Sequence, residues 1–139
     1  MQPMFTESIE ENQSHTLYQM IGGDIKLREL VDRFYDLMDL EPQFATIRQL
    51  HPATLDSSRD KLYWFLSGWT GGPNLFIEKF GHPRLRMRHI PFSIGINERD
   101  QWVKCMDMAM IDVKIVPTLR QHLLQSFMQT ADFMRNKAE

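Results

Sequence analysis

The sequence lacks several features that whole classes of protein require. It has one cysteine, Cys105, which excludes an internal disulfide and is typical of a reducing, cytoplasmic setting. No run of about 18 apolar residues is present, so no segment is predicted to span a membrane. Residues 1–11 are acidic and lack the apolar stretch of a secretory signal. A net charge of −2 gives no general attraction to nucleic acid or to a membrane surface.

Common catalytic and cofactor motifs are also missing. No GxGxxG, Walker or GxSxG pattern occurs, and no flavin or nicotinamide motif is visible. The histidines form no HxxxH pair, so their spacing does not predict a zinc site. Without CxxCH, any haem would be held without thioether bonds. Since the chain has no flavin or nicotinamide motif of its own, a ferric haem iron in it would have to be reduced by a separate reductase. The histidines of the sequence are His15, His51, His82, His89 and His122.

The residues that are present predict one helical domain. A length of 139 residues with 42% apolar side chains suits a single core. Ten Met and nine Phe suit a cavity around a flat ligand, and equally any helical core. We expect a flexible arm over residues 1–13 and a folded domain over 14–139, because the first residues are polar.

Apolar residues at helical spacing predict about four long helices and several fragments, with no strand. A short helix over 17–21 is expected, capped by Ser14 and ended by Gly22-Gly23. Asp24 is a plausible cap for the next helix, and Asn97, with Asp100 three residues on, for a later one. Pro117 is well placed to open the last helix. The expected long helices are 24–40, 55–69, 97–114 and 117–135.

Residues 74–96 are rich in Gly, Pro and basic residues, and are predicted to be mostly loop with one short helix. His89 lies here among alternating apolar and arginine side chains. A single imidazole with an apolar slot and cations for the propionates could hold a haem. An exposed basic loop that binds an acidic partner explains the same pattern. The residues alone do not separate the two interpretations.

The stretch from Gly81 to Phe92, GHPRLRMRHIPF, resembles the group II truncated haemoglobins. Gly71-Gly72-Pro73 before it and the RDQW run at 99–102 strengthen the resemblance, which covers residues 16–134. It implies an all-α fold, a truncated globin with a two-over-two sandwich of helices around haem b. The helix pairs would be 24–40 with 55–69, and 97–114 with 117–135. His89 falls at the proximal position and would bind the iron.

The resemblance also implies a set of distal residues. Tyr35 follows Phe34 where the family has a tyrosine that donates to the diatomic ligand, and Trp102 matches a tryptophan of groups II and III. The family usually has Tyr or Phe, and sometimes His, where this chain has His51, which could join this network or bind iron itself. Each could instead be a plain core or surface residue.

Further positions would contact the cofactor. Ser58 falls where many globins place a distal histidine, and its short side chain suggests an open gate. Leu62 would press on the ligand side of the ring, and Phe65 would line the same wall or serve simply as core. Leu85 is a further candidate for contact with the cofactor, and Lys61 and Arg86 are candidates for the propionates.

These residues predict tight binding of O₂, NO and CO, suited to NO or peroxide detoxification with a reductase as partner. The alternatives are an oxygen or NO sensor acting through a partner, oxygen storage or delivery, and a haem-free helical interaction module.

Overall fold

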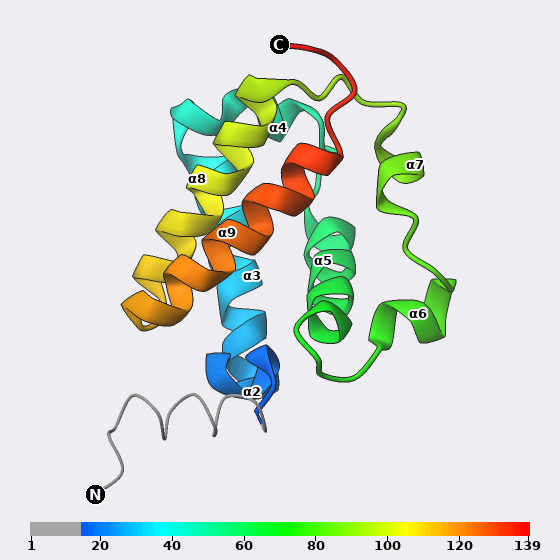
Figure 1. Cartoon of the computed structure of the whole chain (residues 1–139). Coiled ribbons are helices and arrows are strands. Elements are labelled where there is room, and N and C mark those ends of the chain that lie inside the picture. Colours follow the sequence, from blue (N-terminus) through cyan, green and yellow to red (C-terminus); the bar gives the residue numbers. More distant parts are fainter. Residues whose placement is uncertain (1–14) are drawn as a thin grey trace, which may run out of the picture.

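The computed structural model describes residues 15–139, and all regular structure within that range is helical (Figure 1). The predicted arm at 1–13 and the predicted cap Ser14 lie outside the described residues. Nor does any helix among the described residues combine the length and apolar character needed to cross a bilayer. In chain order the elements are α2 (Leu17–Ile21), α3 (Gly23–Leu40), η1 (Pro42–Phe44), α4 (Ala45–Gln49), α5 (Asp56–Trp69), α6 (Leu75–Phe80), α7 (Leu85–His89), α8 (Ile96–Asp112) and α9 (Pro117–Phe133).

The first two helices are joined by a glycine pair. Thr16 caps α2: its Oγ1 accepts from the Gln19 N–H at 3.1 Å, and the Gln19 side chain accepts from the Thr16 N–H. Gly22 then ends α2 at φ 125°, a conformation that glycine adopts without steric cost. Because Gly22 is also the N-cap of α3, the prediction that Asp24 caps this helix is wrong. Asp24 lies in the first turn, where its charge favours the helix dipole.

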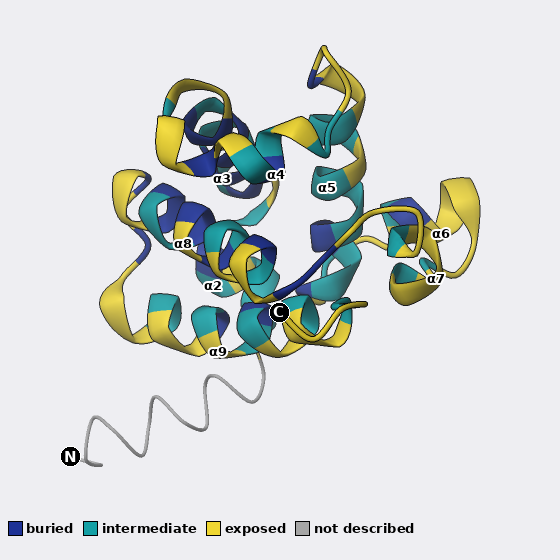
Figure 2. Cartoon of the chain, turned by 90° about the horizontal axis from the view of Figure 1, so that it is seen from above, coloured by how far each residue is buried: buried dark blue, intermediate teal, exposed yellow. Residues whose placement is uncertain are grey.

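Two helix pairs form the sandwich, as predicted: α3 packs on α5, and α8 packs on α9. The α3 helix also packs on α8, which joins the two pairs. Their shared interior holds the largest buried side chains, among them Leu27, Phe34, Met106 and Leu123. Figure 2 shows this burial concentrated on α3 and α8, with exposed residues facing outward.

Helix α8 has a different N-cap from the predicted one, whereas helix α9 begins at the predicted residue, Pro117. Helix α8 has Gly95 as its N-cap, and the carboxylate of Glu98 accepts the Gly95 N–H at 2.7 Å. The predicted pair Asn97 and Asp100 therefore lies inside the helix. Pro117 does open α9, where its missing N–H costs no hydrogen bond.

The segment 74–96 contains two short helices, α6 and α7, where one was predicted. Both lie to one side of the main bundle, with α5 between them and α3 (Figure 1). Gly81 separates them at φ 77°. An ion-paired layer fixes α5 to α3, since the Arg59 guanidinium donates to the carboxylates of Asp36 at 2.7 Å and Asp32 at 3.3 Å. One wall of the space between α5 and α7 is thereby held in place.

Candidate functional site

A cavity of about 560 Å³ lies among α3, α5, α7, α8 and α9. That volume is typical of a site for a cofactor-sized ligand. Its walls are mainly apolar, with a small number of polar groups that converge on it. Of the residues predicted for the site, those that line it are Tyr35, His51, Ser58, Lys61, Leu62, Phe65, Leu85, His89 and Trp102.

His89 is oriented by the backbone of its own helix. Its Nδ1 lies 2.6 Å from the carbonyl oxygen of Leu85, one turn earlier in α7. A carbonyl only accepts, so Nδ1 carries the proton and donates. In the neutral ring the lone pair is then on Nε2, the nitrogen left free to bind a metal. The structure thus supplies the acceptor that a ligating imidazole needs.

Two hydrogen-bond donors in the cavity have no partner among the described residues. Tyr35 is 4% exposed, and neither its hydroxyl nor the indole N–H of Trp102 bonds to any of residues 15–139. Buried Tyr and Trp side chains usually find a partner for these groups. Phe34 lies against both rings, at centroid distances of 5.0 Å and 5.1 Å. The packing therefore fixes both donors while leaving them free to bond a ligand.

Burial keeps the Tyr35 hydroxyl and the Cys105 thiol protonated. It raises the pKa of the Tyr35 hydroxyl far above the ordinary value, with the Arg59 charge opposing, so the group stays a proton donor. Burial also raises the pKa of Cys105 to about 12, and its thiol donates to the Phe34 carbonyl at 3.2 Å. Cys105 is therefore a packed, protonated thiol.

His51 offers the cavity a hydrogen-bond acceptor rather than a donor. Its ring lies edge-on to Tyr35 at 5.7 Å, and its Nδ1 donates to the Ile47 carbonyl at 2.8 Å. Burial lowers the pKa of His51, as do the charges of Arg48 and His89, while the bond to Ile47 opposes them. The ring is neutral near pH 7, and Nε2 is then an acceptor. At neutral pH the cavity therefore has the donors of Tyr35 and Trp102 and an acceptor on His51.

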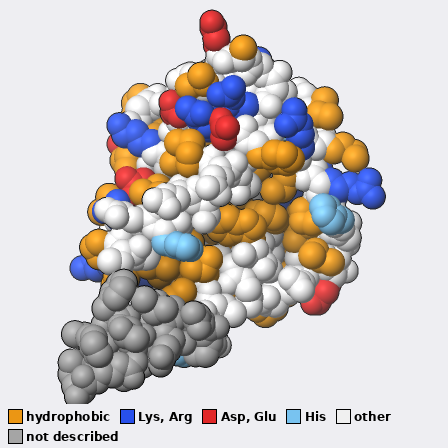
Figure 3. Space-filling model, in the orientation of Figure 1, with side chains coloured by type: hydrophobic (Ala, Val, Ile, Leu, Met, Phe, Trp, Pro, Cys, Tyr) orange, Lys and Arg blue, Asp and Glu red, His pale blue; other side chains and the backbone are white. Residues whose placement is uncertain are grey.

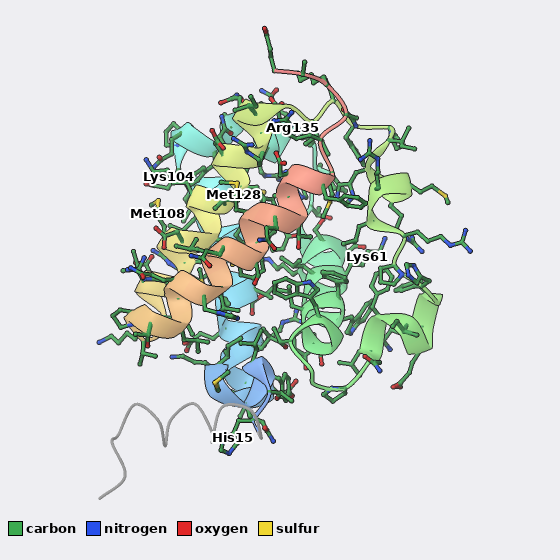
Figure 4. The ribbon with its side chains drawn as sticks, in the orientation of Figure 1. His15, Lys61, Lys104, Met108, Met128 and Arg135 are labelled. Carbon is green, nitrogen blue, oxygen red and sulfur yellow. The ribbon has the colours of Figure 1, made fainter. Side chains whose placement is uncertain are left out.

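Among the predicted cations, Lys61 and Arg86 differ in position. Lys61 lines the cavity from α5, on the side toward α7 (Figure 4). Arg86 does not line it: its guanidinium donates to the Phe133 carbonyl at 3.1 Å and lies over the Phe133 ring. Arg88 lines the cavity instead, because the face of α7 centred on Leu85 includes positions 88 and 89. The helical register of 85–89 would have revealed this.

A C-terminal anchor of the His89 loop was not predicted. The Asn136 amide nitrogen donates to the carbonyls of Phe92 at 2.6 Å and His89 at 3.2 Å, and its oxygen accepts the Ile94 N–H at 2.9 Å. The Asn136 backbone N–H also donates to the Ile94 carbonyl at 2.9 Å. These partners lie more than 40 residues apart in sequence, so no local pattern indicates them.

The described residues fit a haem rather than a metal ion held by side chains alone. They contain no cluster of three or more His, Cys, Asp or Glu side chains able to hold an ion. The cavity offers one imidazole with a free Nε2, apolar walls and two unpartnered donors, which is the donor set of a haem with a diatomic ligand.

Comparison with known proteins agrees with this geometry. The model of the bacterial-like globin family matches residues 16–136. A cold-adapted truncated haemoglobin of Pseudoalteromonas haloplanktis TAC125 is 42% identical, with a TM-score of 0.85 over 88% of this chain and 99% of that one. A group II 2-on-2 haemoglobin of Agrobacterium tumefaciens is 43% identical, with a TM-score of 0.84 over 88% and 95%. A truncated oxygen-avid haemoglobin of Bacillus subtilis is 35% identical, with a TM-score of 0.80 over 88% and 100%.

The resemblance read from the GHPRLRMRHIPF run is thus confirmed over most of the chain, and the globin family implies a haem cofactor. The chain belongs to the group II truncated haemoglobins of the bacterial-like globin family.

Proposed function

We propose that this chain binds dioxygen, and also NO and CO, at a haem b held non-covalently with His89 as the iron ligand. The observation that carries the proposal is the pair of unpartnered donors, Tyr35 and Trp102, in the cavity that His89 also lines. The name of the oxygen-avid relative from Bacillus subtilis supports the same ligand. When bound, the haem supplies the iron that takes a diatomic ligand.

The chain's own residues would hold the cofactor by shape and charge. Leu62 and Phe65 from α5 and Leu85 from α7 form apolar walls. Lys61 and Arg88 bring positive charge to the rim, where the two propionates would bind. Neither cation has a carboxylate partner among residues 15–139. Ser58 is too short to replace a distal histidine, and would leave an open path to the cavity.

The two distal donors would retain the oxygen ligand. A hydrogen bond to an acceptor with partial charge contributes about 1.5 kcal/mol or more. Two such bonds total about 3 kcal/mol, which is on the order of a hundredfold in dissociation rate. Nε2 of neutral His51 accepts rather than donates, so His51 would add no third hydrogen bond to the ligand. Slow release argues against a carrier.

A protein that releases dioxygen slowly is suited to using the bound dioxygen as a reactant. We propose oxidation of nitric oxide to nitrate, or handling of peroxide. In the first reaction NO, O₂ and one electron give nitrate, and both oxygen atoms enter the product. The sequence has no flavin or nicotinamide motif, so we propose that a separate reductase supplies the electron.

Stopped-flow measurement of oxygen dissociation from the ferrous protein tests the proposal. We expect a slow rate for the wild type and rates about tenfold faster for Tyr35→Phe and for Trp102→Phe. Tyr63→Phe is the matched control, because Tyr63 lies on α5 outside the cavity.

Rates that are as fast as in ordinary oxygen carriers and unaffected by either substitution would refute the retention mechanism. A purified protein with no haem absorbance near the Soret region, even after haem is added, would refute the proposal as a whole. A spectrum of His89→Ala that matches the wild type would refute the assignment of the iron ligand.

A further inference from the structure

One group of arginines differs from all the others in the protein. Seven of the ten arginines lie within 4.0 Å of a carboxylate, most of them in ion pairs between helices. The remaining three, Arg84, Arg86 and Arg88, follow one another along α7 and have no carboxylate partner within residues 15–139. The other arginines have their charge balanced by a nearby carboxylate, and these three do not among the described residues. Arg88 faces the cavity, so Arg84 and Arg86 form the uncompensated charge on the outside.

The same segment exposes apolar side chains. Five of the eleven exposed large hydrophobic residues within 15–139 lie between residues 77 and 92, so they are concentrated in this segment. On α7 these are Met87, 55% exposed, and Ile90 just after it, 66% exposed. Figure 3 shows basic and hydrophobic side chains side by side at this edge of the molecule. We call Arg84, Arg86, Met87 and Ile90 the α7 surface.

The backbone at Arg84 is consistent with a role for its side chain outside the fold. Arg84 has φ 48° and ψ 53°, a left-handed conformation that glycine or asparagine adopts at lower cost. Its guanidinium makes no hydrogen bond within residues 15–139. Only its backbone does: the N–H donates to Nδ1 of His82 at 3.0 Å, and the carbonyl accepts the Arg88 N–H at 3.0 Å. Nothing in the packing therefore requires arginine at this strained position.

The composition of the α7 surface favours a protein as its partner. Arg, Met and aromatic residues are enriched at protein interfaces, whereas lysine is depleted. Nucleic acid or anionic membrane would favour a broader field of positive charge, and this chain carries −2 overall. A positive patch around exposed apolar groups fits an acidic protein surface with an apolar centre.

The position of the α7 surface indicates what such a protein would do. Leu85, Arg88 and His89 of the same helix line the cavity. A protein docked on the outer side of α7 is therefore separated from the cavity by the thickness of one helix, roughly 10 Å. We propose that the α7 surface is the docking site for an acidic electron-transfer protein, whose reduced iron–sulfur cluster would then lie close to the cavity. This inference rests on the proposed function, because it names the surface used by the proposed reductase.

Binding kinetics of the haem-loaded ferric protein test the inference. The probe is a plant-type [2Fe–2S] ferredoxin, a small acidic electron carrier, with basic cytochrome c as the opposite-charge comparison. We expect the ferredoxin to associate fast at low salt and at least tenfold more slowly at about 0.2 M salt, and cytochrome c not to bind. Arg84→Glu should lower the association rate about tenfold, and Arg84→Asn should lower it less while keeping a side chain that tolerates the left-handed backbone.

Lys104→Glu is the matched control. It makes the same change in net charge, on α8 at the opposite side of the molecule (Figure 4). Equal effects of Arg84→Glu and Lys104→Glu would overturn the proposal, because they would reflect net charge alone. Absence of ferredoxin binding to the wild type would overturn it too, and Arg84-dependent binding to phosphatidylglycerol vesicles without ferredoxin binding would assign the surface to membrane.

The absorption spectrum of each variant separates this inference from the proposed function. Loss of Arg84-dependent binding in a protein with a normal Soret band and a normal CO complex overturns only the docking site. A protein without the Soret band overturns the proposed function.

Discussion

Replacing Asn136 by alanine tests whether the C-terminal segment positions the His89 loop. The substitution removes three side-chain hydrogen bonds, to the His89 carbonyl at 3.2 Å, the Phe92 carbonyl at 2.6 Å and the Ile94 N–H at 2.9 Å. Each bond contributes about 0.5–1.5 kcal/mol net, and water replaces part of the bonds to the two exposed carbonyls. The Ile94 N–H belongs to a buried residue and loses the most. We expect a loss of about 2 kcal/mol in the free energy of unfolding.

The assay is urea denaturation, followed by circular dichroism, together with the rate of haem transfer to apomyoglobin. We expect Asn136→Ala to unfold at lower urea and to lose haem faster, because the loop that follows His89 is no longer held. Asn136→Asp keeps the acceptor for Ile94 but not the donors, so it should fall between the two proteins. Asn97→Ala, which removes one long exposed bond to Gln101, is the control. A change within about 0.5 kcal/mol and an unaltered haem-transfer rate for Asn136→Ala would refute the reasoning.

Three further predictions concern single sites. Because burial lowers the pKa of His51 below its ordinary value, the ring is neutral above about pH 6.5 and takes a proton only as the pH falls further, so the ferric absorption spectrum should change on acidification in the wild type and not in His51→Phe. Identical spectra of the two proteins from alkaline to acid pH would contradict this. Cys105 should not react with a thiol reagent in the native protein but should react fully in denaturant, because the thiol is fully buried and its pKa is about 12; rapid labelling of the native state would show the burial to be wrong. Gly72→Ala should destabilise the fold by about 1–3 kcal/mol in thermal or urea unfolding, because a Cβ there would lie 2.5 Å from the ring of Tyr18; unchanged stability would show that α2 moves aside at no cost.

The helices were predictable because their apolar residues recur at a period that the backbone itself imposes. The four long helices lie within a residue or two of the predicted bounds, and the break at Gly22-Gly23 and the start at Pro117 depend on local dihedral preferences. The caps were less predictable. Gly95 rather than Asn97 is the N-cap of α8, because the Glu98 carboxylate accepts the Gly95 N–H. Several neighbouring residues could cap the helix, and the local sequence does not show which of them does.

The candidate site also has a part that the sequence predicts and a part that it does not. The run around His89 identifies the family, since that motif is long and continuous, and so it marks the expected proximal position. The cation next to it was harder to choose: Arg86 lies three residues before His89 and Arg88 directly before it. The register of α7 with Leu85 places Arg88 at the cavity, and the tertiary structure brings Arg86 to Phe133.

By itself, the sequence determined the class of fold, the long helices and the family, because periodicity, turn residues and a continuous motif are local properties of the chain. The tertiary structure decided which groups of the cavity are fixed and which are free. It left the Tyr35 and Trp102 donors without partners among residues 15–139 and tied the His89 loop to Asn136. Each of these depends on which atoms from distant segments meet within hydrogen-bond distance, and neither composition nor spacing contains that information.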